Sequence, residues 1–189
     1  MATYNKSSLN TVLLIWSTLQ LPIILLIDLL DFYPPSLYLP PSSPLHIFHA
    51  VKQAYIAELN DPIVQWTPET ASGHDSWMGL FVYFEMALAL PVMLFTVYRL
   101  GVQRKGTSGA HELALLVYGF EAAFTTGVSM HDVGYWDGGV YTEEMKRKLL
   151  WQVYAPWVVM PSLIFVVMVS RIMGRIRVAD EAMEGKKGQ

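Results

Sequence analysis

The chain has 189 residues, of which 53% are hydrophobic and only 15% are charged, and its formal net charge is −3. Soluble domains usually carry about 25% charged residues, so this composition is typical of a single-domain membrane protein. The chain has no cysteine, which excludes disulfides, thiolate nucleophiles and cysteine-based metal sites. It also has no basic stripe with interleaved aromatic residues, so nucleic acid is not an expected partner.

Four stretches are long and apolar enough to cross a bilayer as helices, which takes about 20 residues each. They cover residues 11–33, 77–98, 111–130 and 150–172. The first is too long for the apolar region of a cleaved signal peptide, so we expect it to be retained. The sequence therefore predicts an all-α membrane protein, with a four-transmembrane-helix bundle over residues 11–172. A short N-terminus (1–10) and a charged tail (173–189) flank the bundle.

Prolines shape the predicted helices. The segment that begins PPSLYLPPSSP at Pro34 ends the first helix, and the apolar spacing of residues 46–59 predicts a short helix at the membrane interface. Four more prolines lie inside the spans, namely Pro22, Pro91, Pro156 and Pro161. Each is expected to kink its helix and free a backbone carbonyl, which opens room for a pocket, although membrane helices also accommodate proline without a functional reason.

The distribution of lysine and arginine predicts the orientation. With four spans, both termini and the second loop share one face, and this face carries nine of the thirteen basic residues. The opposite face carries Lys52, Lys146, Arg147 and Lys148. We therefore expect both termini in the cytosol. The chain ends KKGQ, which matches the dilysine retrieval signal of endoplasmic reticulum membrane proteins and so predicts a multi-pass protein there. A basic tail that binds anionic membrane lipids is the alternative.

Several ionisable side chains fall within the spans, where they are costly and indicate a functional site by default. At about 1.5 Å per residue, Glu85 and Glu121 both lie about 12 to 13 Å from the lumenal ends of their spans. Asp28 in the first span, and Tyr154 and Trp157 in the fourth, lie toward the same side. The sequence therefore predicts one pocket, in the lumenal half of the bilayer, that all four spans surround.

Structural roles are the alternative for these side chains. Glu85 or Glu121 alone can be a neutral side chain that only forms a structural hydrogen bond between helices. Two such structural glutamates at the same depth are less expected than one shared site. Asp28 and Asp31 lie near a helix end, where a carboxylate reaches interfacial water, so structural roles and ligand contact both stay open. The histidines have no metal-ligand spacing, so neither a metal nor a cofactor is expected. Four spans without a polar stripe disfavour a channel.

Four short runs in chain order carry a family resemblance, and they are LPIILLIDLLDFYPP, LNDPIVQ, FEMALALP and VYAPWVVMP. Together they resemble the EXPERA-domain family, which includes the sigma-two receptor and the emopamil-binding sterol isomerase. The resemblance covers about residues 12–172. It implies a four-helix membrane domain that binds sterol-like or amine ligands, and it suggests a homodimer.

The two branches of the family match different residues. In the receptor-like comparison, the ligand-binding aspartates fall on Asp28 and Asp61, the glutamate of the second span falls on Glu85, and a tyrosine falls on Tyr154. This comparison implies that these side chains contact a ligand.

In the isomerase-like comparison, a glutamate falls on Glu121 and a tryptophan on Trp157. The isomerase histidine is replaced by Glu85, an acid one turn later by Ala89, and an asparagine by Tyr154. The chain thus keeps one isomerase acid and loses another.

Paired carboxyls in an apolar layer favour acid–base chemistry. Glu85 and Glu121 are not both expected to be ionised, because burial and mutual repulsion oppose charge, so one can donate a proton and the other accept one. An aromatic face such as Trp157 stabilises a carbocation between them. The leading hypothesis is therefore an isomerase or cyclase that acts on a sterol-like or terpenoid-like lipophilic molecule. The alternative is a non-catalytic sterol or amine receptor, or a lipid-trafficking protein.

Overall fold

The computed structural model describes residues 8–67 and 76–187, and this part of the chain is helical without a strand. Predictions for residues 1–7 and 188–189 lie outside the described residues, as do the side chains of Lys186 and Lys187. The helices are α1 (Ser8–Ile23), α2 (His46–Leu59), α3 (Pro62–Gln65), α4 (Ser76–Phe84), α5 (Leu90–Thr96), α6 (Gly109–Val133), α7 (Glu143–Lys148) and α8 (Ala155–Lys187).

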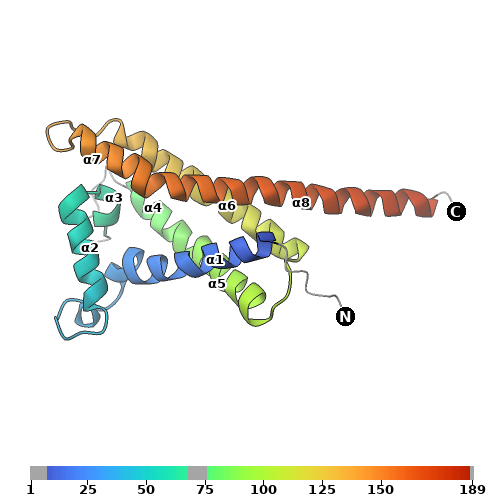
Figure 1. Ribbon diagram of the computed structural model, residues 1–189, viewed down its shortest axis with the longest axis horizontal. Coiled ribbons are helices and arrows are strands. Elements are labelled where there is room, and N and C mark those ends of the chain that lie inside the picture. Colours follow the sequence, from blue (N-terminus) through green and yellow to red (C-terminus); the bar gives the residue numbers. More distant parts are fainter. Residues whose placement is uncertain (1–7, 68–75, 188–189) are drawn as a thin grey trace.

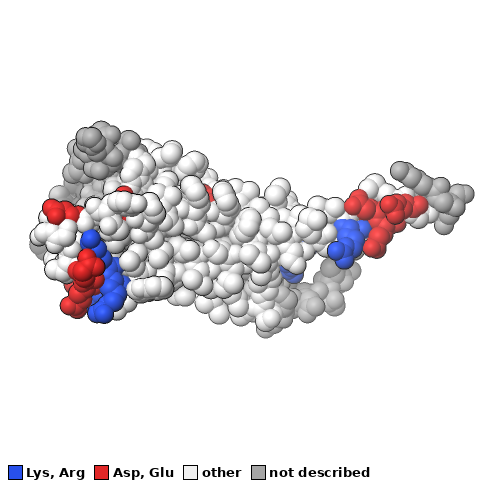
Figure 2. Space-filling view, turned by 90° about the horizontal axis from the view of Figure 1, so that it is seen from above, with Lys and Arg blue, Asp and Glu red and all other residues white. Residues whose placement is uncertain are grey.

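Four helical stretches are long and apolar enough to cross a membrane, which confirms the predicted all-α bundle. They are Ser8–Asp28, Trp77–Val102, Gly109–Val133 and Glu143–Gly185. The second stretch joins α4 to α5, and the fourth joins α7 to α8. In Figure 2, charged side chains gather at the two ends of the molecule and the surface between them is almost uncharged. This distribution suits a bilayer around the middle of the bundle.

The helices α6 and α8 form the most extensive contact in the bundle and run side by side over much of their length (Figure 1). Gly119 permits this contact, because a Cβ atom there would lie only 2.8 Å from the Pro161 carbonyl oxygen and the Phe165 nitrogen. α1 packs against α5 on the other side, and the core between the helices holds buried side chains such as Leu13, Met93 and Met168.

The helix α2 lies across one end of the bundle, at a steep angle to α1 (Figure 1), and it is the short helix predicted over residues 46–59. Lys52, which is only 3% exposed, holds it there. The Lys52 ammonium donates to the Asp31 carboxylate at 2.7 Å and to the Ile27 carbonyl oxygen at 3.3 Å. The end of the first span and the interfacial helix therefore form one unit.

At the opposite end of the bundle, the buried carboxylate of Glu112 ties α6 to α8. The Arg175 Nε atom donates to it at 2.6 Å, and the Thr107 hydroxyl donates at 2.6 Å. Arg171 lies 3.4 Å from the same carboxylate. Charge-assisted hydrogen bonds of this kind offset the cost of burying the carboxylate.

Two predicted boundaries differ from the structure. The first span ends at Asp28, before the predicted residue 33, because the chain turns through a 3₁₀ segment (Leu30–Phe32) ahead of Pro34 and Pro35. The predicted boundary at residue 172 is the end of the apolar stretch but not of the helix, since α8 continues to Lys187. The segment beyond residue 172 has no proline and is rich in helix-forming residues.

Candidate ligand chamber between the four spans

Three of the four spans contain a short π-helical segment that is separated by one residue from an intrahelical proline. These three segments are Ile24–Asp28, Glu85–Ala89 and Leu149–Tyr154, and a further π-helical segment, Val97–Val102, ends the second span. A proline cannot donate to the helical hydrogen-bond ladder, and π-helical turns are frequent at functional sites. Asp28, Glu85 and Tyr154 all lie at the ends of these segments, so the local distortion lies at the level of the predicted site residues.

Two cavities, which together we call the chamber, lie among the spans. The first has a volume of about 140 Å³ and is lined in part by Glu121 and Thr126 of α6, so we call it the α6 lobe. The second has a volume of about 200 Å³ and is lined in part by Trp157 and Pro161 of α8, so we call it the α8 lobe. The lobes adjoin, because both are lined by Gln20, Ile63, Glu85 and Ala122.

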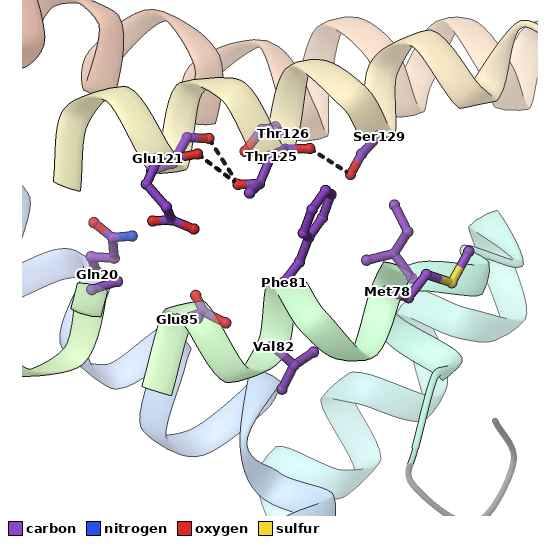
Figure 3. A pocket seen from close by; sticks show the side chains of 12 residues that line it. Gln20, Met78, Phe81, Val82, Glu85, Glu121, Thr125, Thr126 and Ser129 are labelled. Carbon is purple, nitrogen blue, oxygen red and sulfur yellow. Dashed lines mark hydrogen bonds between the residues drawn. The ribbon is translucent and has the colours of Figure 1, made fainter. Parts of the chain in front are cut away.

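The two glutamates point into the α6 lobe from opposite walls. Figure 3 shows Glu121 projecting from α6 and Glu85 projecting toward it from the second span. Both side chains are partly buried. Because Glu85 also lines the α8 lobe, it is the carboxyl that both lobes share.

The α8 lobe contains three more of the predicted site residues. Asp28 from the end of the first span, and Tyr154 and Trp157 from the fourth, all line this cavity. The structure thus brings five of the six predicted side chains together around one chamber, and a ligand in the α8 lobe would lie between two carboxyls and an indole face.

Asp61 is the exception, because it is fully buried and is not among the residues that line either lobe in the described part of the chain. It caps α3: its Oδ1 atom accepts from the Ile63 backbone nitrogen at 2.9 Å, and its Oδ2 atom accepts from the Tyr55 hydroxyl at 2.6 Å. Burial and the nearby Asp61 carboxylate raise the pKa values of Tyr55 and Tyr141. The hydrogen bonds of Asp61 therefore hold α3 in position, and Ile63 of α3 lines both lobes of the chamber.

A hydrogen-bonded chain that sequence reasoning missed forms another wall. The Trp16 indole nitrogen donates to the Tyr118 hydroxyl oxygen at 2.9 Å, and the Tyr118 hydroxyl donates to the Gln20 amide oxygen. Trp16 also packs against Trp157, with ring centroids 4.9 Å apart. Gln20 is an uncharged polar side chain inside an apolar span, and that was the signal in the sequence that could have indicated it.

Two hydroxyl groups of the α6 lobe, those of Thr125 and Ser129, bond within their own helix. The Thr125 hydroxyl donates to the Glu121 carbonyl oxygen at 3.0 Å, and the Ser129 hydroxyl donates to the Thr125 carbonyl oxygen at 3.1 Å. Ala89, where the isomerase-like comparison expects an acid, lines the α6 lobe with an apolar surface. Glu85 and Glu121 are therefore the two carboxyls of this lobe among the described residues.

The chamber combines an apolar lining with a few convergent polar groups, which is the usual composition of a small-molecule site. Within residues 8–67 and 76–187, no three His, Asp or Glu side chains are grouped as metal ligands. Carboxyls that face each other in an apolar enclosure are suited to bind a cationic group and to transfer protons.

Comparison with curated proteins finds no match for this chain. The sequence model of one family matches residues 47–168, and its description is EXPERA (EXPanded EBP superfamily). The matched part begins in α2, includes the second and third spans and reaches residue 168 in the fourth, so it contains Glu85, Glu121 and Trp157. It covers more than half of the chain and agrees with the resemblance of the short sequence runs. The chain therefore belongs to the EXPERA family, the expanded EBP superfamily.

Proposed function

We propose that this multi-pass membrane protein binds a sterol-like or terpenoid-like molecule in the chamber and catalyses a proton-transfer isomerisation or cyclisation. The observation that carries the proposal is that Glu85 and Glu121 point into the same lobe from opposite walls. The chamber lies among the spans, so a lipophilic substrate can enter from the bilayer.

The proposed reaction moves a carbon–carbon double bond without a change in composition. A neutral carboxyl of the pair gives its proton to one alkene carbon, which forms a C–H bond and leaves a carbocation on the neighbouring carbon. The ionised carboxyl then removes a proton from an adjacent carbon, and the electron pair of that C–H bond forms the new double bond. In a cyclisation, a second alkene attacks the carbocation before the proton is lost. The Trp157 indole, which lines the adjoining lobe, stabilises the cation.

Substrate turnover by purified protein or membranes tests this proposal through Glu85→Gln and Glu121→Gln. Each variant keeps the side-chain size but cannot act as a general acid or base near neutral pH. General acid–base catalysis contributes about 10²- to 10⁴-fold, so we expect a loss of at least about a hundredfold. Glu144→Gln, at an exposed carboxylate of α7, is the matched control and should keep full activity. Undiminished conversion by both chamber variants would exclude the mechanism.

A second candidate function is a non-catalytic receptor for lipophilic amines or sterols. The α8 lobe supports it, because Asp28 and Glu85 line this cavity together with Trp157 and can hold a cationic amine. Tyr154 and Ala89, which replace two polar residues of the isomerase-like pattern, point the same way. This function predicts saturable binding of an amine or a sterol without a product detectable by mass spectrometry. Product formation that depends on either glutamate would exclude it.

We also propose that the protein resides in the endoplasmic reticulum with both termini in the cytosol. The excess of basic residues on the face that carries both termini supports the proposed orientation. The first turn of α1 and the last turns of α8 lie toward the same end of the molecule (Figure 1), as an even number of spans requires.

A homodimer, which the family suggests, would give twice the 21.3 kDa mass of the chain in light-scattering measurements.

A further inference from the structure

Gln20 occupies a special place in the chamber. Its side chain lines both lobes, and the residue is only 7% exposed. It lies opposite Glu85 and Glu121, which Figure 3 shows in the same space. Gln20 is one of the four described residues that line both lobes, so a molecule that fills both can contact its amide.

The hydrogen-bonded chain behind Gln20 fixes which way the amide faces. An indole nitrogen can only donate, so Trp16 must donate to the Tyr118 oxygen. The Tyr118 hydroxyl hydrogen then needs an acceptor, and the oxygen of the Gln20 amide accepts it. If the amide were flipped, the Tyr118 hydrogen would have no acceptor in this buried chain, which is unfavourable.

It follows that the amide nitrogen of Gln20, with its two hydrogens, faces the chamber. Figure 3 shows this nitrogen pointing toward the carboxyl of Glu121. Because Trp16 can only donate, it fixes the direction of the Tyr118 hydroxyl, and this hydroxyl fixes the Gln20 amide oxygen. The Gln20 amide therefore presents only its nitrogen, a hydrogen-bond donor, to the chamber. This donor lies where the two lobes adjoin, which we call the seam, beside Glu85 and Glu121.

We propose that Gln20 is the recognition residue for an oxygen atom of the ligand, which is therefore an oxygenated lipid with a carbonyl, ether or hydroxyl group. The oxygen accepts a hydrogen bond from the Gln20 amide at the seam, and the hydrocarbon body extends along the apolar walls. This inference rests on the proposed binding of a lipophilic molecule in the chamber. It adds the chemical group that is recognised and the residue that recognises it.

Binding of matched ligand pairs to the purified full-length protein tests the inference. Cholestanone with cholestane, and farnesol with farnesene, each compare an oxygenated molecule with a hydrocarbon of the same skeleton. The wild-type protein is expected to prefer the oxygenated member, and Gln20→Leu should lower the ratio of the two affinities about tenfold. Because the ratio is compared between variants, the different partitioning of the two ligands into detergent cancels.

Two further variants keep the test decisive if Gln20→Leu does not fold. Tyr118→Phe keeps the ring but removes the hydroxyl that orients the amide, so it should also lower the preference for the oxygenated ligand. Leu19→Ala changes an exposed neighbour of Gln20 in the same helix and should leave the preference unchanged.

The outcomes separate the inference from the proposed function. Saturable binding with the same affinity ratio in the wild-type protein, Gln20→Leu and Tyr118→Phe would overturn the inference and leave the lipid-binding function intact. A failure of the wild-type protein to bind either member of both pairs would overturn the proposed function, and this inference with it.

Discussion

Asp28 and Asp61 show how similar acids acquire different roles from their surroundings. The family resemblance assigns both to a ligand, but only Asp28 lines the chamber. Asp61 is 0% exposed, and its two carboxylate oxygens accept from the α3 backbone and from Tyr55. A carboxylate with this geometry stabilises the fold, because its loss would leave buried donors without acceptors.

We predict that Asp61→Ala destabilises the protein by about 2 to 4 kcal/mol, since it removes a helix cap and leaves the Tyr55 hydroxyl unsatisfied. Asp28→Ala should have a smaller effect on stability but should weaken the binding of a cationic amine. Thermal unfolding in detergent and amine binding, measured on both variants, check the prediction. Equal stability of the two variants would contradict this division of roles.

At the scale of helices, the α6–α8 contact decides the shape of the chamber. α6 contributes Glu121 and α8 contributes Trp157, so a change in the distance between these helices changes both lobes. The contact depends on Gly119, where the backbone of α8 leaves no room for a side chain. Small residues at such positions let membrane helices approach closely.

We predict that Gly119→Ala costs about 2 kcal/mol of stability and weakens ligand binding, because a Cβ atom 2.8 Å from backbone atoms forces the helices apart. Gly127→Ala is the matched control in the same helix, where nothing lies within 4 Å of the added atom. Thermal unfolding of the two variants checks the prediction. The contact would not be as tight as described if both variants were as stable as the wild-type protein.

The sequence predicts much at this scale, because apolar length and buried charge are local signals. They indicated the four spans, the helix over residues 46–59, and a cavity that Glu85 and Glu121 share. The Trp16–Tyr118–Gln20 chain was missed, because it joins residues about 100 positions apart and, of the three, only the polar Gln20 gives a local signal. The place of Asp61 behind the chamber wall depends in the same way on tertiary contacts. The prolines predicted distortion but not that the helices would absorb it as π-helical turns.

At the scale of the whole molecule, the orientation determines from which side of the membrane each end is reached. The first turn of α1, the last turns of α8 and the loop over residues 103–107 lie toward one end of the molecule (Figure 1). The loop over residues 134–142 lies at the other end, where the Tyr141 hydroxyl donates to the Asn60 carbonyl oxygen between α2 and α3. The absence of cysteine from the sequence makes this arrangement easy to test.

We predict that a cysteine introduced by Lys105→Cys reacts with a membrane-impermeant maleimide in cells whose plasma membrane alone is permeabilised. A cysteine introduced by Val140→Cys should react only after the reticulum membrane is also permeabilised. Both positions are exposed, so access to the side chain is not limiting. The reverse pattern would place the termini in the lumen, and equal labelling of both would contradict the four-span topology.

The proposal that Glu85 and Glu121 together move a proton on a lipid is tested most directly by untargeted lipid profiling in D₂O. Cells that express the wild-type protein, Glu85→Gln, Glu121→Gln or no protein would be compared. We predict a lipid isomer that carries one solvent-derived deuterium, that appears with the wild-type protein and that is lost in both variants. Lipid profiles that are the same with and without the wild-type protein, or a product that persists in both variants, would contradict the proposed catalysis.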